Sequence, residues 1–168
     1  MKISLITVTR NSGQYLEDSI KSVVGQTYKD IEFIIIDGKS NDNTIDIIKK
    51  YENYIHHWIS EPDRGMYDAI NKGMQLSTGD VIGILNSDDI FDNNDVITSI
   101  INAFTEQQTD SVYGDLEYVE QSNLNKVYRI WKGRPYKRNR FFTGWMPAHP
   151  TFYFKRKLFE DFGGWWES

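Results

Sequence analysis

Two adjacent acids, Asp88 and Asp89, follow directly after a short apolar stretch of the chain. Residues 81–85 have the length and composition of a buried strand, and the apolar run stops abruptly at Asn86 and Ser87. Acids at the carboxyl end of such a strand lie where open α/β sheets bind ligands, and carboxylates suit a divalent cation that bridges to phosphate. The alternative is that the two acids only cap the helix that follows.

Earlier strand-like segments also end in residues that could bind a ligand. Residues 3–8 run into Thr9, residues 31–36 run into Asp37, and a later loop with Pro and Gly carries Arg64. Helical patterns separate these segments, which predicts a parallel sheet with right-handed crossovers. We therefore expect an α/β fold, with a mostly parallel central sheet flanked by helices, whose strand ends bring these residues together with the acid pair.

The roles of Asp37 and Arg64 stay open on the residues alone. Asp37 could accept hydrogen bonds from a base or ribose, or it could cap a turn or helix. Arg64 could pair with a phosphate, or it could form a surface ion pair with Glu61 or Asp63. A nucleotide diphosphate at this acidic edge would need a bridging cation; oxygen ligands favour Mg²⁺ or Mn²⁺, with Asp88 as the first candidate ligand.

Local signals predict where several elements begin and turn. Asn11 or Ser12 is expected to cap a helix over residues 15–24. Residues 116–131 have the pattern of a β-hairpin, with its turn expected at residues 123–125.

Length and composition predict one domain over residues 1–168, because 168 residues suffice for a core and no linker-like segment interrupts them. The chain contains no cysteine, which excludes disulfides and thiolate metal sites. No apolar run reaches the roughly 18 residues of a membrane helix, and the first residues carry too short a run for a signal peptide. We therefore expect neither export nor a membrane span. Gly163 and Gly164 are expected to end the last helix.

Charge is unevenly distributed along the chain. Residues 1–125 hold 9 basic and 21 acidic side chains, whereas residues 126–157 hold 10 basic and no acidic ones. Within residues 126–142 cations alternate with aromatic residues, as in nucleic-acid sites and in surfaces that meet anionic lipid. The acidic remainder of the chain and the absence of a nucleic-acid motif favour lipid headgroups, or the diphosphate of a lipid-linked acceptor. A flexible lid or solvated loop is the simpler alternative.

Three nucleotide-binding signatures are missing. No GxGxxG follows the first predicted strand, which disfavours a dinucleotide oxidoreductase, and no GxxxxGK[ST] occurs, which disfavours a P-loop NTPase. A sugar nucleotidylyltransferase would carry a Gly-rich phosphate loop after that strand, where this chain has TRNSGQY.

Three segments, in this order and spacing, resemble the family 2 glycosyltransferases of the GT-A fold: ISLITVTRN, SIKSVVGQTYKDIEFIIIDGKSNDNT and EPDRGMYDAINKGMQLSTGDVIGILNSDD. The likeness covers nearly the whole chain, particularly to the bacterial branch that builds surface polysaccharides such as O-antigen and capsule. It implies transfer of a hexose from a nucleotide donor, usually a UDP-sugar, with inversion and with a divalent metal, Mn²⁺ or Mg²⁺. It also implies that residues 1–114 bind the nucleotide sugar and that residues 115–168 form an acceptor-side segment.

The resemblance also implies roles for particular residues. It assigns the donor nucleotide to Val8, Thr9, Asp37, Arg64, Asn71, Asn86 and Ser87. Asp37 resembles the acid that holds the uracil, and Arg64 resembles the basic residue near the base and diphosphate. Asp88 occupies the metal-binding place of the family's DxD motif. Asn86 replaces the first acid of that motif, so Asp89 is the candidate for the additional negative charge at the metal.

The general base of the family normally comes from a short acidic motif, for which this chain shows no match before Ser168. Either the chain is truncated before that motif, or another residue serves. Asp115 and His149 are the titratable groups best placed in the sequence for the acceptor side. For His149 an acceptor-binding or structural role is the alternative.

The sequence as a whole predicts an inverting, metal-dependent glycosyltransferase that acts on a lipid-linked or growing surface glycan such as lipopolysaccharide. It predicts a location in the bacterial cytoplasm, including the inner face of the cytoplasmic membrane. A nucleotide-sugar-binding module without turnover is the alternative from a different class, because the base motif is missing. A sugar nucleotidylyltransferase is the third option.

Overall fold

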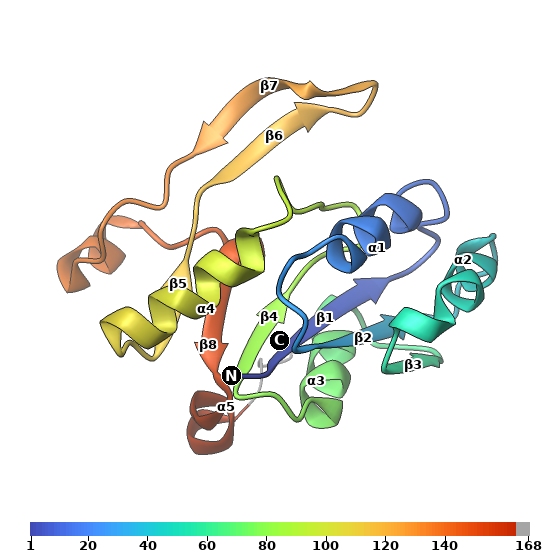
Figure 1. Cartoon of the computed structure of the whole chain (residues 1–168), viewed down its shortest axis with the longest axis horizontal. Coiled ribbons are helices and arrows are strands. Elements are labelled where there is room, and N and C mark those ends of the chain that lie inside the picture. Colours follow the sequence, from blue (N-terminus) through green and yellow to red (C-terminus); the bar gives the residue numbers. More distant parts are fainter. Residues whose placement is uncertain (164–168) are drawn as a thin grey trace.

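The computed structural model describes residues 1–163 and contains a six-stranded sheet between two layers of helices, together with a separate two-stranded sheet (Figure 1). The strands are β1 Ile3–Thr9, β2 Ile31–Asp37, β3 His57–Ser60, β4 Val81–Ile84, β5 Ser111–Tyr113, β6 Leu116–Glu120, β7 Asn123–Trp131 and β8 Phe152–Lys155. The helices are α1 Leu16–Val24, α2 Thr44–Lys50, α3 Met66–Leu76, α4 Val96–Gln107 and α5 Arg156–Phe162. The predicted α/β class is confirmed.

The strand order of the large sheet is β3-β2-β1-β4-β8-β5. The strands β1 to β4 run parallel to one another, whereas β8 is antiparallel to both of its neighbours. The sheet is therefore mostly parallel, as expected.

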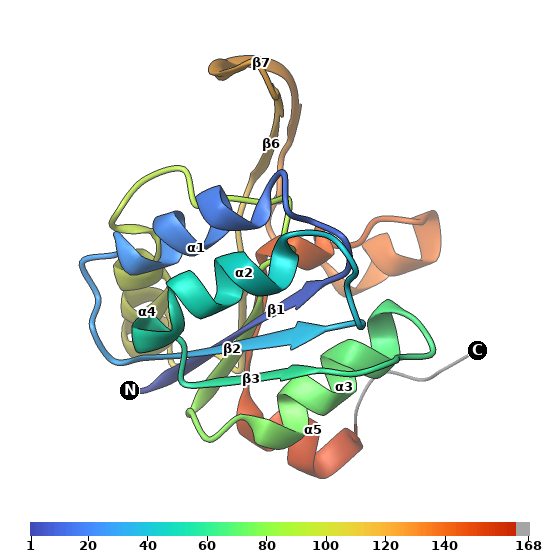
Figure 2. The same ribbon diagram turned by 90° about the vertical axis from the view of Figure 1, so that its right-hand side faces the viewer.

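Helices cover both faces of the large sheet (Figure 2): α1, α2 and α4 lie on one side, and α3 and α5 lie on the other. Alternate residues of β1 point to the two faces. Leu5 packs in the cluster of Leu16 and Ile20 from α1, while Ile6 packs in the cluster of Ile70 and Met74 from α3. Burial on both faces explains why the central strands are continuous apolar runs.

The register of the parallel strands aligns their carboxyl ends. Thr9 at the end of β1 lies opposite Asp37 at the end of β2, which in turn lies opposite Ser60 at the end of β3. On the other side of β1, Ile84 of β4 lies opposite Ile6. The loops after these strands therefore begin at one edge of the sheet, which we call the carboxyl edge.

The antiparallel strand β8 explains a glycine in the core strand β4. Gly83 lies opposite Tyr153, and a Cβ atom at Gly83 would overlap the Tyr153 ring. Because β8 and β5 are paired, the end of β5 at Tyr113 and the start of β8 at Phe152 also lie side by side at the carboxyl edge.

Two local predictions are wrong. The helix α1 is capped at Tyr15 rather than at Asn11 or Ser12. The backbone N–H of Ser12 instead donates to the Thr44 hydroxyl, and that of Gly13 donates to the Asp42 carboxylate, so both residues are held in a loop.

The hairpin turn also differs from the prediction. Residues 121–122 form the turn, and Asn123 already pairs with Glu120 as the first residue of β7. The last helix ends before Gly163, as expected, and Gly164 lies outside the described residues.

Opposite the carboxyl edge, a buried carboxylate ties the amino ends of the strands together. The side chain of Glu32 is 3% exposed and accepts hydrogen bonds from Lys2 Nζ at 2.8 Å, Thr78 N at 2.7 Å and Ser4 Oγ at 2.5 Å. Burial alone would raise the pKa of Glu32, but the hydrogen bonds outweigh it and lower the pKa from 4.5 to about 2.

Replacing Glu32 by Gln should lower the free energy of unfolding at neutral pH by on the order of 2 kcal/mol. Because the folded pKa lies below the ordinary value of 4.5, the ionised carboxylate stabilises the fold above that pH, and this contribution is lost as the pH falls toward 2. Urea unfolding at neutral pH and near pH 2 measures the difference, which should shrink with acid. The matched control is Glu106→Gln on the exposed surface of α4. Equal stability of the two variants at neutral pH would contradict the assignment.

Candidate functional site

The loop after β4 places the two adjacent acids differently. Asp88 is exposed and makes no hydrogen bond or ion pair within residues 1–163. Asp89 is half-buried and accepts a hydrogen bond from Asn86 Nδ2 at 2.8 Å, while its backbone N–H donates to the Asn86 carbonyl at 3.1 Å. The loop is therefore a turn that presents one carboxylate to solvent and turns the next toward the protein.

Burial dominates the electrostatics of Asp89. Desolvation raises the pKa of its carboxyl; the hydrogen bond from Asn86 opposes this, the Asp88 charge adds to it, and His149 lowers the pKa. Burial also raises the pKa of the Tyr153 hydroxyl, with a smaller contribution from Asp89. An acid with a raised pKa beside a second carboxylate gains from a bound cation, which would relieve the repulsion between them.

Buried polar atoms without partners lie at the end of β1 and in the β4 loop. The hydroxyls of Thr7 and Thr9 and the side-chain oxygen of Asn86 have no hydrogen-bond partner among the described residues. Beside them, the hydroxyl of Ser87 lies 2.9 Å from that of Ser12. Native proteins pair almost all buried polar groups, so these atoms indicate a place where a polar ligand completes the bonding.

Asp37 is fully buried, and its carboxylate is already hydrogen-bonded within the protein. It accepts from Ser40 N at 3.0 Å and from Ser60 Oγ at 2.6 Å, and the Ser40 hydroxyl donates to its other oxygen. These bonds fix the start of the β2–α2 loop and join it to the end of β3. Asp37 therefore has the turn role considered from the sequence, at the edge where a base would bind. Val8 pairs with Ile36, the residue before Asp37, and is buried toward α3.

The loop between β3 and α3 reaches the same edge, because the Asp63 carboxylate lies against Gly38. Arg64 is 77% exposed, with its guanidinium 3.8 Å from the carboxylate of Asp68. Asn71 lies half-buried one turn after Asp68 on α3.

Of the two candidate bases, Asp115 is the more constrained. Its carboxylate accepts from Lys132 Nζ and from the Gly133 backbone N–H, each at 2.8 Å, and these bonds lower its pKa. An acid whose oxygens are both engaged and whose pKa is lowered is a weak proton acceptor. Asp115 serves instead to tie the end of β7 to the segment after β5.

His149 lies near the acid pair. It belongs to a short 3-10 turn, His149–Thr151, that precedes β8 and packs against β4. The Thr151 hydroxyl donates to the Gly114 carbonyl at 3.2 Å, which joins this turn to the end of β5. His149 is exposed, and its charge acts on Asp89. The structure thus brings a histidine from late in the chain to the β4 loop.

The acidic loop fits a metal that draws most of its ligands from a substrate. No cluster of three or more His, Cys, Asp or Glu side chains able to hold a metal occurs within residues 1–163. Asp88 and Asp89 supply carboxylates, and the unpartnered oxygen of Asn86 lies in the same turn. Mg²⁺ and similar hard cations commonly bind through one or two carboxylates plus phosphate and water, so this small set is sufficient.

Two residues near the site were missed from the sequence. Thr7 is two positions before Thr9, so both point to the same face of β1, and that spacing was the signal available. Tyr153 gave no such signal, because its contact with Gly83 depends on where β8 inserts.

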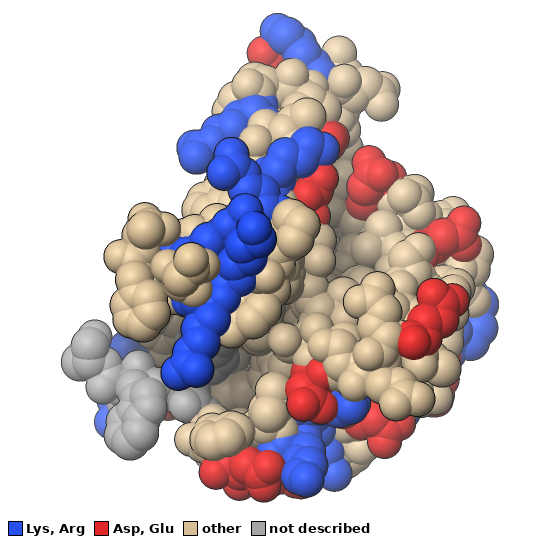
Figure 3. All heavy atoms as spheres, turned by 90° about the vertical axis from the view of Figure 1, so that its left-hand side faces the viewer, with Lys and Arg blue, Asp and Glu red and all other residues tan. Residues whose placement is uncertain are grey.

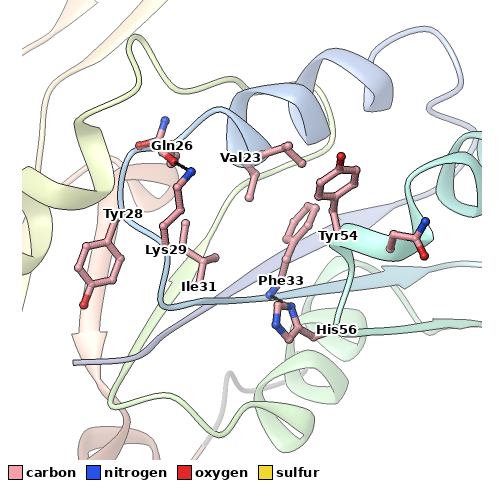
Figure 4. Close-up of a pocket in the computed structure, with 10 residues that line it drawn as sticks. Val23, Gln26, Tyr28, Lys29, Ile31, Phe33, Tyr54 and His56 are labelled. Carbon is pink, nitrogen blue, oxygen red and sulfur yellow. Dashed lines mark hydrogen bonds between the residues drawn. The ribbon is translucent and has the colours of Figure 1, made fainter.

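A separate pocket of about 310 Å³ lies near the amino end of β2 (Figure 4). Two of its polar side chains are engaged within the protein: Phe33 N donates to His56 Nδ1 at 3.1 Å, and Lys29 Nζ donates to the Gln26 carbonyl at 2.8 Å. None of the predicted site residues lines it. We therefore assign the candidate site to the carboxyl edge.

Comparison with known proteins agrees with this architecture. Residues 4–163 match the model of the family described as Glycosyl transferase family 2. The chain therefore belongs to this family. The predicted family is confirmed, whereas the O-antigen and capsule branch remains a prediction.

Relatives in mycobacteria extend beyond the matched region. The chain is 31% identical over 164 residues to an uncharacterized glycosyltransferase of Mycobacterium tuberculosis, covering 96% of this chain and 62% of the relative. It is 30% identical over 166 residues to a PGL/p-HBAD biosynthesis glycosyltransferase of Mycobacterium bovis, covering 95% and 61%. The chain thus spans less than two thirds of the length of these relatives.

Solved structures share the fold. The chain superimposes on S. aureus TarS 1–349 in complex with UDP-GlcNAc with a TM-score of 0.73 at 19% identity, covering 96% of this chain and 47% of that one. A mannosyltransferase of Pyrobaculum calidifontis in complex with GDP-Man and Mn²⁺ gives a TM-score of 0.73 at 19% identity, covering 97% and 47%. The predicted GT-A fold is confirmed. Across the described residues, no helix is both long and apolar enough to cross a membrane.

Replacing Asp89 by Asn should raise the melting temperature of the metal-free protein at neutral pH. Because the folded pKa of Asp89 is raised, the fold favours the protonated acid, and stability falls as the pH rises through that pKa. A neutral amide avoids this loss, so the gain should disappear in acid. Circular dichroism melts at neutral and at acidic pH measure it, with Asp92→Asn, an exposed acid of the same loop, as the matched control. A lower melting temperature for Asp89→Asn than for the control at neutral pH would contradict the assignment.

Proposed function

We propose that this chain acts as an inverting glycosyltransferase. Its sugar donor is a UDP-sugar, which binds at the carboxyl edge. One observation carries the proposal. Buried oxygens of Thr7, Thr9 and Asn86 that have no hydrogen-bond partner in the described part of the chain lie at this edge, together with the Asp88 carboxylate, which has no ion pair there. A ligand with hydroxyls and phosphates satisfies both kinds of group. Nucleotide sugars in the complexes of structural neighbours support this choice.

The donor nucleotide in this proposal lies across the ends of β1 and β2. Val8 and Thr9 contact the base, with Asp37 as its hydrogen-bond acceptor and Arg64 near the diphosphate. The bonds from Ser40 and Ser60 hold the Asp37 carboxylate in place before a ligand arrives, which limits the ordering required on binding. Two further residues complete the proposed donor site, Asn71 and Ser87.

Asp88 and Asp89 are the proposed ligands of the divalent metal, Mn²⁺ or Mg²⁺. When bound, such a cation stabilises the negative charge that develops on the departing nucleoside diphosphate. Asn86 orients Asp89 through its Nδ2 hydrogen bond, so the amide that replaces the first acid of the family motif positions its neighbour.

His149 is the proposed general base, with Asp115 as a positioning residue. In an inverting transfer the acceptor oxygen attacks the anomeric carbon while the bond to the diphosphate breaks, and a base takes the acceptor proton. The neutral imidazole has a lone pair for this proton, and His149 lies close enough to the β4 loop to act on the Asp89 carboxylate. Asp115 holds Lys132 and Gly133, and so fixes the segment that follows β7.

The proposed acceptor is a lipid-linked or growing surface glycan at the inner face of the bacterial cytoplasmic membrane. The basic, aromatic residues 126–142 meet the end of β5 at Arg134, whose carbonyl accepts from the Tyr113 hydroxyl, and are suited to anionic partners. A nucleotide-sugar-binding module is the second candidate function, because the engaged state of Asp115 leaves a single candidate base.

Replacing Asp88 by Ala should weaken UDP binding in the presence of manganese by on the order of 100-fold, because the variant loses the exposed metal ligand. Without manganese the variant and the wild type should bind UDP equally. Isothermal titration calorimetry with and without the metal measures both. Asp92→Ala, an exposed acid of the same loop, is the matched control. Unchanged UDP affinity of Asp88→Ala under both conditions would refute the metal assignment.

Replacing His149 by Gln should lower kcat at least roughly 100-fold and remove the acidic limb of the pH–rate profile, because a base must be deprotonated to act. Release of UDP from a donor with acceptor present measures both quantities. His57→Gln, an exposed histidine on β3, is the control. A raised KM at unchanged kcat would instead assign His149 to acceptor binding. Tight UDP-sugar binding without turnover by the wild type would favour the binding module.

A further inference from the structure

The hairpin β6–β7 projects from the body of the protein (Figures 1 and 2). Nearly every residue of β7 is exposed, and its large side chains include Tyr128, which is 66% exposed, and Ile130. A two-stranded sheet that stands alone is only marginally stable in water. Exposed apolar side chains on such an element indicate a surface that is covered by a partner.

Five of the seven cations in residues 126–142 have no acidic partner among the described residues. Residues 126–142 contain seven basic and no acidic residues. Lys126 pairs with Glu120, and Lys132 pairs with Asp115. Arg134, Lys137 and Arg138 are exposed and make no ion pair with any residue between 1 and 163. Figure 3 shows a band of basic side chains that runs from the hairpin across the face below it, with most acidic side chains of that view away from the band.

Aromatic rings accompany these cations. Phe142, in the 3-10 turn Arg138–Thr143, is 86% exposed, and Tyr136 and Phe141 are also exposed. The Tyr136 and Phe141 rings lie 6.0 Å apart, and Phe141 lies 5.5 Å from Trp145, which packs on Tyr113 at the end of β5. The inner rings thus anchor the turn on the sheet, while Phe142 points outward as an unsupported apolar group.

We infer that residues 124–142, which we call the docking segment, bind the surface of an anionic lipid bilayer. Unpaired cations suit lipid phosphates, and exposed aromatic rings suit the interfacial layer beside them. Residues 1–125 carry 21 acidic against 9 basic side chains, so the same bilayer repels the rest of the body and orients the molecule with this segment toward the lipid. A nucleic acid would be repelled in the same way, and although its bases could stack on an aromatic ring, the exposed aliphatic side chains of Leu124, Val127 and Ile130 suit a lipid interface instead.

The docking segment is joined directly to the carboxyl edge. The Tyr113 hydroxyl at the end of β5 donates to the Arg134 carbonyl at 2.9 Å, and Gly133 N donates to Asp115 at 2.8 Å. Docking therefore holds the edge that carries Asp88 and His149 close to the headgroups. The proximity of this edge to the headgroups matters for a lipid-linked acceptor, and that consequence rests on the proposed function. The docking of the segment on the bilayer does not depend on the proposed function.

Vesicle co-sedimentation of the full chain tests the inference. Binding to phosphatidylcholine vesicles that contain phosphatidylglycerol should exceed binding to pure phosphatidylcholine and should weaken with salt. The triple variant Arg134→Gln, Lys137→Gln, Arg138→Gln should reduce partitioning roughly 100-fold, because each cation near an anionic surface contributes about fivefold. Phe142→Ser should reduce it several-fold further.

Matched controls separate these effects from a general loss of charge or apolar surface. The triple variant Lys29→Gln, Lys49→Gln, Lys157→Gln removes three exposed cations elsewhere, and Phe162→Ser removes an exposed ring on α5. Both controls should sediment like the wild type. Equal losses in the controls, or equal binding to the two kinds of vesicle, would overturn the inference.

Two further measurements distinguish this inference from its alternatives. Binding of a single-stranded oligonucleotide, lost in the docking-segment variant, without vesicle binding would reassign the surface to nucleic acid and overturn lipid docking. Calorimetry with UDP and manganese tests the donor site separately. Intact UDP binding with no vesicle binding refutes only the docking segment, whereas vesicle binding without UDP binding refutes only the proposed function.

Discussion

The parallel register of β1 with β2 and β4 is the constraint on which the site depends. Both faces of β1 are buried, so a shift of one residue would exchange the side chains that face α1 with those that face α3 and would disrupt both cores. The same register sets Thr9 opposite Asp37, and it ends β4 early enough for the Asn86–Asp89 turn to lie beside them. Hydrophobic packing thus fixes the positions of polar groups that contribute little to the fold.

Buried polar groups differ between the two edges of the sheet in their hydrogen bonding and in the direction of their pKa shifts. At the amino edge, Glu32 is surrounded by donors and its pKa is lowered, as expected of an element that stabilises the fold. At the carboxyl edge, the hydroxyls of Thr7 and Thr9 have no hydrogen-bond partner within residues 1–163, and burial raises the pKa of Asp89. Each unpaired buried group costs about 1–3 kcal/mol in the absence of a ligand. A protein retains such a cost where binding removes it, which is why we assign the ligand to the carboxyl edge.

The sequence was sufficient for the sheet, its flanking helices and the edge at which the strand-end residues gather, because apolar runs and turn residues are local signals. The sequence was not sufficient where residues from distant segments form the hydrogen bonds or contacts that decide the local structure. Thr44 and Asp42 hold the backbone of Ser12 and Gly13, so the helix begins later than its polar residues suggest. Thr7 was hidden within an apolar run, and the neighbourhood of His149 and Asp89 depends on an antiparallel strand whose position no spacing rule supplies.

The strand β8, from late in the chain, inserts between β4 and β5 and so brings a late segment next to the β4 loop. Tyr153 fills the space above Gly83, and a side chain at either position sets the room available to the other. The Asp89 charge adds to the rise that burial causes in the pKa of the Tyr153 hydroxyl, and the turn before β8 carries His149 to the same carboxylate. The strand that completes the sheet therefore also sets the electrostatic environment of the acid pair. A change in the packing of β8 would therefore reach the β4 loop without any contact with a ligand.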